Sequence, residues 1–431
     1  MLVLALALSG ILLVHAFAGY GLSLRVVLAL VARGRIQSGH PVREAPGLPP
    51  SELPRVTMVV AAHNEAACIG AKLRNFQALD YPKEKLDLIV GSDGSEDETD
   101  AIVARFARDD PRVRLSTAPR VGKSAVLNRC VPQARGEWVL LTDANTMLRP
   151  DALRALARHT INPDVGAIAG RLVLLKPGSS TGNGNADGFG ETATEGEGLY
   201  WRHETWLKST EARLGVLLGM NGALYALRRD LFTPLRPETI VDDLVIPLRL
   251  VIAGHALAWA PDALAFEETA TSLADESRRR VRIAAGNFQS LAWLWPLLSP
   301  RRGLWAYAFW SHKVLRWCAP LFLALAFVAN AALALQGRLW SALFAAQCVF
   351  YGLALVGALV AEPVSEAPWP RRAKWTRLLL LPRAIHFFVR MNWAQACGFV
   401  RFVLGRQRAT WERTARAFEA VGDAADSGER E

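Results

Sequence analysis

The sequence VTMVVAAHNEA, residues 56–66, decides the fold of the soluble part of this chain. Its first six residues, Val56–Ala61, form a short apolar run rich in β-branched side chains, and His63-Asn64-Glu65 is a polar turn that ends the run. A stretch with helical character follows, to about Leu79. A buried strand, a polar turn and a helix together form the repeating unit of an α/β sheet. We therefore expect a mostly parallel α/β fold.

The same unit recurs further along the chain. Two more strands and two more helices are predicted at Leu86–Ser92, Glu98–Arg108, Gly122–Ala134 and Trp138–Thr142. The two strands end at Asp93 and Asp143. Ligands of open α/β sheets bind beyond the carboxyl ends of the strands, so these two acids are expected near one ligand.

Composition divides the chain into a soluble part and a membrane part. Of the 431 residues, 51% are hydrophobic and 21% are charged, which excludes a disordered or collagen-like chain. The apolar residues gather in the first thirty positions and between about Trp305 and Val360. The net charge of +10 therefore predicts contact with membrane lipid. Nucleic acid is not expected as a partner, because the arginine runs flank apolar spans and lack interleaved aromatics.

The first apolar stretch, Leu2–Leu24, is long enough to cross a hydrocarbon layer of about 30 Å as a helix. A signal peptide is the alternative. It is disfavoured because no basic residue precedes the stretch, whereas Arg25, Arg33 and Arg35 follow it. Positive charge on that side predicts that the chain after Arg35 is cytoplasmic.

The C-terminal part has two further predicted spans, Trp317–Leu335 and Trp340–Val360. The last apolar stretch, Leu378–Leu404, contains four basic or histidine side chains, which favours an amphipathic helix packed at the membrane surface or in a bundle. The glycine-rich segment Gly178–Gly198 is predicted to be disordered, with a mobile lid as the alternative.

Acidic residues recur where strands are expected to end, at Asp93, Asp143 and Asp242-Asp243. Carboxylates gathered at one edge repel one another unless a cation offsets them. If the chain is extended there, Asp143 and Asn145 point to the same side and can share a divalent cation with phosphate oxygens. A diphosphate is the ligand that this arrangement suits.

Basic residues that could hold the same diphosphate lie in RVGKS, with Arg120 and Lys123, and in the run Arg278–Arg282. In an extended chain Arg280 and Arg282 would share one side, and in a helix Arg279 and Arg282 would do so. The GKS sequence suggests a phosphate-binding loop of an ATPase. That alternative fails because Thr117 stands where the first glycine of the motif is required.

Eight motifs, in order, resemble the membrane-bound glycosyltransferases of family 2, the group of cellulose, hyaluronan and poly-N-acetylglucosamine synthases. They are VTMVVAAHNEA, SDGSED, RVGKSAVLN, GEWVLLTDANT, GLYWRHETWLKSTEARLG, GMNGALYALRRDLF, VDDLVIPLRL and RRRVRIAAGNF. The resemblance covers roughly residues 56–287 and implies a GT-A fold, which is a Rossmann-like α/β domain. It also implies that this domain lies between an N-terminal transmembrane helix and a C-terminal transmembrane or interfacial helical region.

The resemblance implies a role for each matching residue. The residues that would bind the donor nucleotide are Glu65, Asp93, Lys123 and Asp143. Asp143 and Asn145 would hold Mg²⁺ or Mn²⁺, although Asn145 stands where the family's D-x-D has its second acid. Asp243 would be the general base. The residues that would contact the diphosphate or the acceptor are Asp242, Arg279, Arg280 and Arg282. Arg279 replaces a glutamine of the family's Q-x-x-R-W, and Ile283 replaces its tryptophan, which leaves the acceptor open.

The expected organisation is a transmembrane helix in 1–31, a linker in 32–54, a cytoplasmic glycosyltransferase domain in 55–287, interfacial helices in 288–316, two transmembrane helices in 317–360, an amphipathic or membrane-packed helical region in 361–417 and a disordered tail in 418–431. The location implied is the cell's inner membrane. The activity implied is inverting transfer of a sugar from a nucleotide diphosphate sugar, typically UDP-linked, to a carbohydrate or a lipid-linked acceptor.

Three alternatives stay open. A growing polysaccharide as acceptor would need a partner subunit or a homo-oligomer for export, because the chain shows about three clear spans. A single-addition glycolipid transferase would need no channel. A membrane scaffold that binds a nucleotide sugar or a synthase partner would need no catalysis, but both Asp143 and Asp243 are present, which favours an enzyme.

Overall fold

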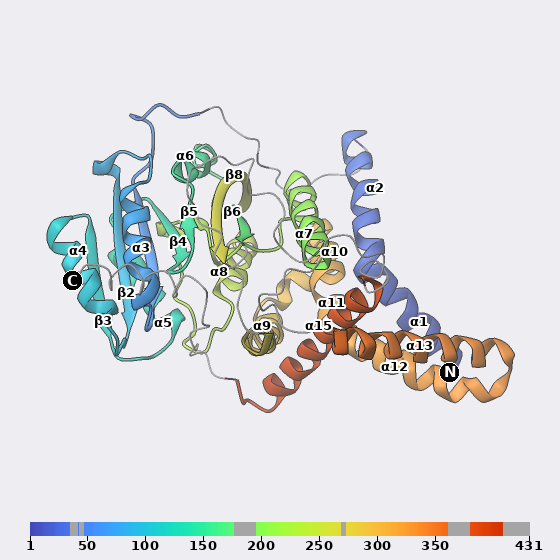
Figure 1. Cartoon of the computed structure of the whole chain (residues 1–431). Helices are drawn as coiled ribbons and strands as arrows, with labels where there is room; N and C mark the ends of the chain where they lie inside the picture. The colour runs from blue at the N-terminus through green and yellow to red at the C-terminus, as the bar shows by residue number, and fades with distance from the viewer. Residues whose placement is uncertain (35–41, 43–46, 176–194, 269–272, 361–379, 408–431) are drawn as a thin grey trace, which may run out of the picture.

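The computed structural model describes residues 1–34, 42, 47–175, 195–268, 273–360 and 380–407. Most of the predicted glycine-rich loop Gly178–Gly198, the predicted tail 418–431 and part of the predicted linker 32–54 lie outside these residues. The described chain forms a sheet flanked by helices, and the long helices from both ends of the chain lie together on one side of it (Figure 1).

The sheet has eight strands in the order β3-β2-β1-β4-β7-β6-β8-β5. Their bounds are β1 Val56–Ala62, β2 Leu86–Asp93, β3 Val113–Ala118, β4 Trp138–Asp143, β5 Met147–Leu148, β6 Val165–Leu175, β7 Tyr225–Arg228 and β8 Ala256–Glu268. Strands β3, β2, β1 and β4 are parallel; β1, β2 and β4 are the three predicted strands, whereas β3 is not among the predicted ones. The sheet as a whole is mixed, because β7 runs antiparallel to both of its neighbours and β5 runs antiparallel to β8.

The strand order reverses at β1. The chain moves outward from β1 through β2 to β3 and then returns to place β4 on the other side of β1. In the register, Ala61 pairs with both Gly91 and Asp143, so β1, β2 and β4 end at the same level. Such a reversal opens a crevice beyond the carboxyl ends of the strands, which is where ligands of these sheets bind.

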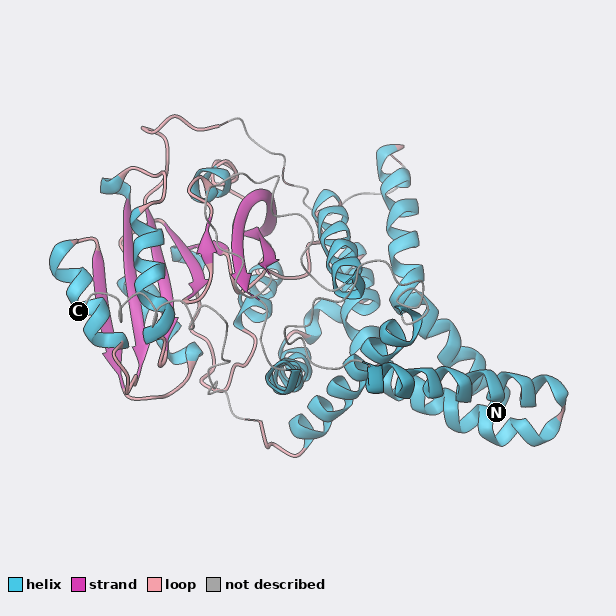
Figure 2. Ribbon diagram, viewed as in Figure 1, coloured by secondary structure: helices cyan, strands magenta, loops and turns pink. Residues whose placement is uncertain are grey.

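Apolar packing on both faces explains why the central strands are almost continuously hydrophobic. On β1, Met58 and Val60 point into one core and Val59 points into the other. Helix α3 (Ala66–Gln77) covers the first of these faces with Ile69 and Phe76. The other helices around the sheet are α4 Thr99–Asp109, α5 Lys123–Cys130, α6 Ala152–Ala157, α7 Glu195–Arg213, α8 Asp242–Ile252 and α9 Leu273–Trp293 (Figure 2).

Three helices in the described chain are long and apolar enough to cross a membrane: Leu2–Ala32, Ala319–Gln336 and Arg338–Leu359. They match the three predicted spans. The first consists of α1 (Leu2–Val14), a π-helical segment (His15–Gly19) and α2 (Tyr20–Ala32). Figure 1 shows that α1 and α2 run in different directions, and π-helical turns are a known cause of such bends. Helix α1 packs against α12 (Ala319–Leu333), whereas α2 packs against α7.

Short helices connect α9 to the second span. They are η6 Trp295–Leu298, η7 Pro300–Arg302, α10 Leu304–Ala308, η8 Phe309–Val314 and α11 Leu315–Trp317. Helix α13 (Arg338–Val360) completes an antiparallel pair with α12 (Figure 1). Helix α15 (Leu380–Val403) packs against both α13 and α9.

Helix α15 has one packed side and one exposed side. The ring of Phe399 meets Phe288 of α9 at 4.9 Å between centroids, and Gly398 lies directly against Ala284. Trp393, on the other side, is 71% exposed. The exposed side of α15 is therefore partly apolar, and its predicted place at the membrane surface or in a bundle stays a prediction.

The glycine at the contact between α15 and α9 gives a test of this packing. A Cβ added at Gly398 would lie 2.4 Å from Cβ of Ala284 and 2.8 Å from the backbone nitrogen of Ala285. We expect Gly398→Ala to lower the free energy of unfolding by about 1–3 kcal/mol, because α15 must move away from α9.

The matched control is Gly352→Ala on α13, where an added Cβ meets no atom within 4 Å. Alanine favours a helix over glycine, so this variant should be neutral or stabilising. The measurement is the thermal unfolding midpoint in detergent, followed by tryptophan fluorescence. Equal midpoints for the two variants would contradict the close packing of α15 on α9.

Candidate active site

Asp143 is the last residue of β4 and lies at the edge where the strand order reverses. Its side chain is 38% exposed, so it is accessible to a ligand. The prediction that Asp143 and Asn145 share one side of an extended chain is wrong, because the chain turns at Ala144-Asn145. The backbone nitrogen of Thr146 donates to the carbonyl oxygen of Asp143 at 3.2 Å. It is this turn that keeps Asn145 next to Asp143.

Lys123 joins Asp143 to a second acid from a distant part of the sequence. Its Nζ donates to Oδ1 of Asp143 at 2.9 Å and lies 3.6 Å from Oδ1 of Asp242. Burial alone would lower the pKa of Lys123, but these two carboxylates outweigh burial and raise the pKa well above its usual value. Lys123 therefore carries a fixed positive charge between the two acids.

The buried carboxylate of Asp93 positions Lys123. It accepts hydrogen bonds from the backbone nitrogen of Val121 at 2.7 Å and from that of Gly122 at 2.9 and 3.1 Å. Gly122 has φ of 104°, a conformation that favours glycine, and it is the residue before α5. Asp93 thus holds the loop that precedes α5, and Lys123 is the first residue of that helix.

Glu65 lies where β1 meets α3. Its backbone nitrogen donates to Oγ1 of Thr99 at 2.8 Å, and Cys68 donates its thiol to Oε2 of Glu65 at 3.1 Å. Nδ1 of His63 is 2.9 Å from the carbonyl oxygen of Asp93. These contacts tie the ends of β1 and β2 together, so Glu65 and Asp93 lie on the same side of the crevice.

Asp242 and Asp243 form the first turn of α8, where the helix dipole favours negative charge. Asp242 is buried and accepts a hydrogen bond from the hydroxyl of Tyr225 at 3.1 Å. Oδ2 of Asp243 accepts one from the backbone nitrogen of Gly222 at 3.1 Å. Burial, followed by the charge of Asp242, raises the pKa of Asp243, while Lys123 and Lys208 act in the opposite direction. A carboxylate with a raised pKa is suited to accept a proton.

The arginines of RRRVR lie on helix α9, which settles the two predicted pairings in favour of Arg279 and Arg282. Burial and the charge of Arg279 lower the pKa of Arg282, although the charge of Asp242 acts in the opposite direction. Burial would lower the pKa of Arg279, but Glu267 and other nearby carboxylates raise it. Both guanidinium groups therefore interact electrostatically with Asp143 and Asp243.

Arg280 is directed elsewhere. Its Nε is 2.6 Å from Oε1 of Glu276, its Nη1 is 2.5 Å from the sulfur of Met391, and its guanidinium lies 5.5 Å from the ring centroid of Phe387. Met391 and Phe387 belong to α15. These contacts pack Arg280 against α15.

The oxygen ligands at this edge of the sheet are those that a divalent cation prefers. Within the described residues, no group of three or more histidine, cysteine or acidic side chains could hold a metal alone. Mg²⁺ at nucleotide sites needs only one or two protein carboxylates, together with waters and phosphate oxygens. The accessible carboxylate of Asp143, with Asn145 in the same turn, fits an ion that is shared with a diphosphate.

Lys72 is a residue of this region that the sequence did not reveal. Its side chain is fully buried, and its Nζ donates to Oγ1 of Thr142 at 3.0 Å and to the carbonyl oxygen of Thr146 at 2.5 Å. Thr142 in turn donates to the carbonyl oxygen of Ala223 at 2.7 Å. The sequence does hold one signal: Lys72 follows Ile69 by three positions and so lies on the apolar face of α3.

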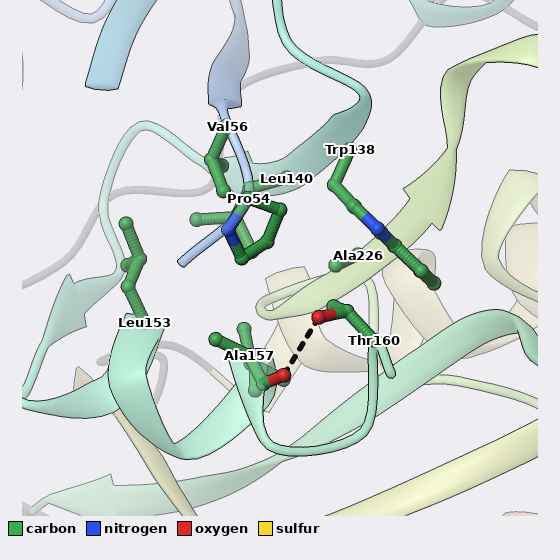
Figure 3. A pocket seen from close by; sticks show the side chains of 9 residues that line it. Pro54, Val56, Trp138, Leu140, Leu153, Ala157, Thr160 and Ala226 are labelled. Carbon is green, nitrogen blue, oxygen red and sulfur yellow. Dashed lines mark hydrogen bonds between the residues drawn. The ribbon is translucent and has the colours of Figure 1, made fainter. Parts of the chain in front are cut away.

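Figure 3 shows a small apolar pocket, which lies at the end of β4 opposite to Asp143. Val56 and Trp138, the first residues of β1 and β4, line it together with Pro54 and Leu153. Its cavity volume is about 10 Å³, which is room for no more than one water. It is therefore not a site for a substrate.

Sequence comparison identifies related proteins. Residues 54–286 match the family described as glycosyltransferase like family 2. The beta-monoglucosyldiacylglycerol synthase of Trichormus variabilis is 27% identical over 317 residues, which cover 70% of this chain and 64% of that protein. The poly-beta-1,6-N-acetyl-D-glucosamine synthase of Staphylococcus aureus is 22% identical over 256 residues, which cover 58% of this chain and 59% of that protein. The chain thus spans less than two thirds of the length of these relatives.

Structural comparison supports the fold. The mannosyltransferase PcManGT from Pyrobaculum calidifontis, solved in complex with GDP-Man and Mn²⁺, superposes with a TM-score of 0.64 at 22% sequence identity. The superposition covers 93% of this chain and 99% of that protein. The sheet and the long helices at both chain ends are therefore part of a shared architecture.

Lys72 gives a prediction about pH. Burial lowers the pKa of Lys72 from 10.5 to about 7, although Asp143 and Cys68 act in the opposite direction. Between about pH 7 and pH 10 the unfolded chain holds a proton there that the folded chain has lost, so stability from this group rises with pH. The slope is at most about 1.4 kcal/mol per pH unit.

We expect Lys72→Met to remove that rise. The unfolding midpoint of the wild type should therefore increase relative to that of the variant between pH 7 and pH 9. The measurement is thermal unfolding at several pH values. Lys83→Met, at an exposed position before β2, is the control and should leave the pH dependence unchanged. Parallel pH profiles for the wild type and Lys72→Met would show that Lys72 keeps its ordinary pKa.

Proposed function

Since the chain belongs to the glycosyltransferase like family 2, we propose that it transfers a sugar, with inversion, from a nucleotide diphosphate sugar to the hydroxyl of a carbohydrate or lipid-linked acceptor at a membrane surface. The observation that carries this proposal is the position of Lys123. It lies 2.9 Å from Asp143 and 3.6 Å from Asp242, the neighbour of Asp243. A donor-binding acid and a proton-accepting acid are thereby held on two sides of one crevice.

On the donor side, Lys123, Arg279 and Arg282 supply positive charge for the diphosphate. Asp143 and Asn145 would hold Mg²⁺ or Mn²⁺, and the Mn²⁺ in the complex of PcManGT supports an ion of this class. When bound, such an ion would supply charge that neutralises the leaving diphosphate. Glu65 and Asp93, at the ends of β1 and β2, lie where the nucleoside would bind.

On the acceptor side, Asp243 takes the proton of the acceptor hydroxyl. That oxygen then attacks the anomeric carbon from the face opposite the diphosphate, which inverts the configuration. The hydrogen bond from Gly222 to Oδ2 of Asp243 orients the carboxylate. The raised pKa of Asp243 makes it a stronger base than an exposed aspartate.

The membrane arrangement supports an acceptor that reaches the site along the bilayer surface. Three helices in the described chain could span a membrane, and Lys313 and Arg316 lie just before the second of them. Basic flanks favour the cytoplasmic side, so we place the sheet at the cytoplasmic face of the inner membrane. The names of the two relatives, a glycolipid synthase and a polysaccharide synthase, support both acceptor classes.

The first experiment incubates the purified full-length chain in detergent with a panel of UDP- and GDP-linked sugars, with and without Mg²⁺ or Mn²⁺, and measures transfer together with release of nucleoside diphosphate. For the donor that reacts, Asp243→Asn should lower the transfer rate by about 10²- to 10⁴-fold, because the general base is lost. The affinity for the nucleotide should stay the same.

Asp230→Asn is the control, because Asp230 is an exposed acid paired with Arg228 outside the crevice. It should transfer sugar at the wild-type rate. If Asp243→Asn retains full transfer, Asp243 is not the base.

Asp143→Asn tests the donor side. Because the carboxylate that would face the metal is lost, we expect the concentration of Mn²⁺ that half-saturates nucleotide binding to rise by about tenfold or more. The measurement is calorimetric titration of nucleoside diphosphate at a series of Mn²⁺ concentrations, which needs no turnover. An unchanged Mn²⁺ requirement would remove Asp143 from the metal site.

A further inference from the structure

Lys208 of α7 places an ammonium group beside the proposed base. Its Nζ donates to Oδ1 of Asn221 at 2.5 Å, and the next residue, Gly222, donates its backbone N–H to Asp243. The same Nζ lies 5.9 Å from the ring centroid of Trp259. Lys208 is half-buried, and the hydrogen-bond partner that it has is a neutral amide.

The carboxylates nearest to Lys208 along α7 are already bound by other groups. Glu204 and Glu211 share the face of Lys208, since the three residues are spaced by four and three positions. Glu211 contacts Nδ1 of His312 at 2.5 Å and the hydroxyl of Tyr20 at 2.8 Å. Glu204 contacts Nε2 of His312 at 3.3 Å and Arg316 at 2.5 Å. Across the described residues, no carboxylate lies within ion-pair distance of the ammonium of Lys208.

A second lysine belongs to η8, the segment that contacts the two glutamates flanking Lys208 on α7. Lys313 follows His312, the residue that contacts both glutamates of α7, and it too has no ion-pair partner among the described residues. Burial, and next to it the charge of Lys313, lower the pKa of Lys208 to about 8, while Glu204 and Asp243 oppose the shift. Two like charges in a half-buried place repel each other unless an anion offsets them.

The position of these two lysines fits a lipid headgroup. Lys313 precedes the candidate span Ala319–Gln336 by less than two helical turns, and α7 packs against α2 of the candidate span Leu2–Ala32. A group bound there would therefore lie at the membrane surface. The chemistry required is an anion that accepts two charged hydrogen bonds, and a phosphoryl group meets that requirement.

We propose that Lys208 and Lys313 bind the phosphoryl group of a lipid headgroup, so that the acceptor is a phosphorylated lipid whose free hydroxyl lies at Asp243. This inference rests on the proposed glycosyl transfer. In the transfer step the bond from the anomeric carbon to the diphosphate breaks, the bond to the acceptor oxygen forms, and the acceptor proton passes to Asp243.

The test measures binding of short-chain lipids to the purified full-length chain in dodecyl maltoside by titration calorimetry. Dihexanoyl phosphatidylglycerol should bind at least about tenfold more tightly than dihexanoylglycerol, which has a hydroxyl but no phosphate. Glycerol 3-phosphate, the soluble source of the same group, should bind more weakly than the lipid.

Lys208→Met and Lys313→Met should each weaken binding of dihexanoyl phosphatidylglycerol by about tenfold or more, and Lys208→Arg should retain most of it. Lys83→Met, at an exposed site far from α7, is the matched control and should bind like the wild type. The thermal unfolding midpoint of each variant checks that it folds.

Equal affinity of the wild type for the two lipids overturns the proposal without the use of any variant. Equal binding of glycerol 3-phosphate overturns the lipid source, and wild-type binding by both methionine variants overturns the role of the two lysines. Release of nucleoside diphosphate is measured on the same preparations. Release without phospholipid binding therefore defeats this inference alone, and phospholipid binding without release defeats the proposed transfer.

Discussion

The contacts of Lys123 with Asp143 and Asp242 are the constraint on which the site depends. Asp143 ends β4 and Asp242 begins α8, so the two acids come from distant parts of the sequence. With Asp243 they form a group of three carboxylates that would repel one another without a cation between them. Lys123 supplies that cation at 2.9 Å from Asp143, and Asp93 fixes the loop that delivers it. Asp93 therefore contributes to the position of Lys123 through the backbone of this loop.

A second set of contacts holds the backbone behind these acids. Lys72 binds both ends of the segment Thr142–Thr146 that contains Asp143, and Thr142 continues the chain of hydrogen bonds to Ala223. Gly222, next to Ala223, binds Asp243. A buried lysine costs stability because its charge is desolvated. At this position it links the backbone segments next to Asp143 and Asp243.

A third cluster connects α7 to η8 and to the candidate span Leu2–Ala32. His312 of η8 lies between Glu204 and Glu211 of α7, and Tyr20 of α2 binds Glu211. Burial opposes ionisation of both glutamates, but His312 outweighs it, so their pKa values are lowered. Breaking such a buried pair by removing one partner is strongly destabilising, because a charge is left without compensation. Helix α7 is therefore joined to α2 and η8 by groups that must stay paired.

The sequence by itself determined the local elements and the composition of the site. Strand β1, its polar turn, the strands that end at Asp93 and Asp143, and the three apolar spans follow from hydrophobic period and length, which act within a short stretch of chain. Only the tertiary structure decided which side chains meet. It placed Arg279 and Arg282 on one side of a helix, packed Arg280 against α15, turned the chain at Asn145, and brought Lys72 to a segment far away in sequence. The reason is physical: a contact between distant segments depends on strand order and helix packing, and no local pattern of residues encodes either.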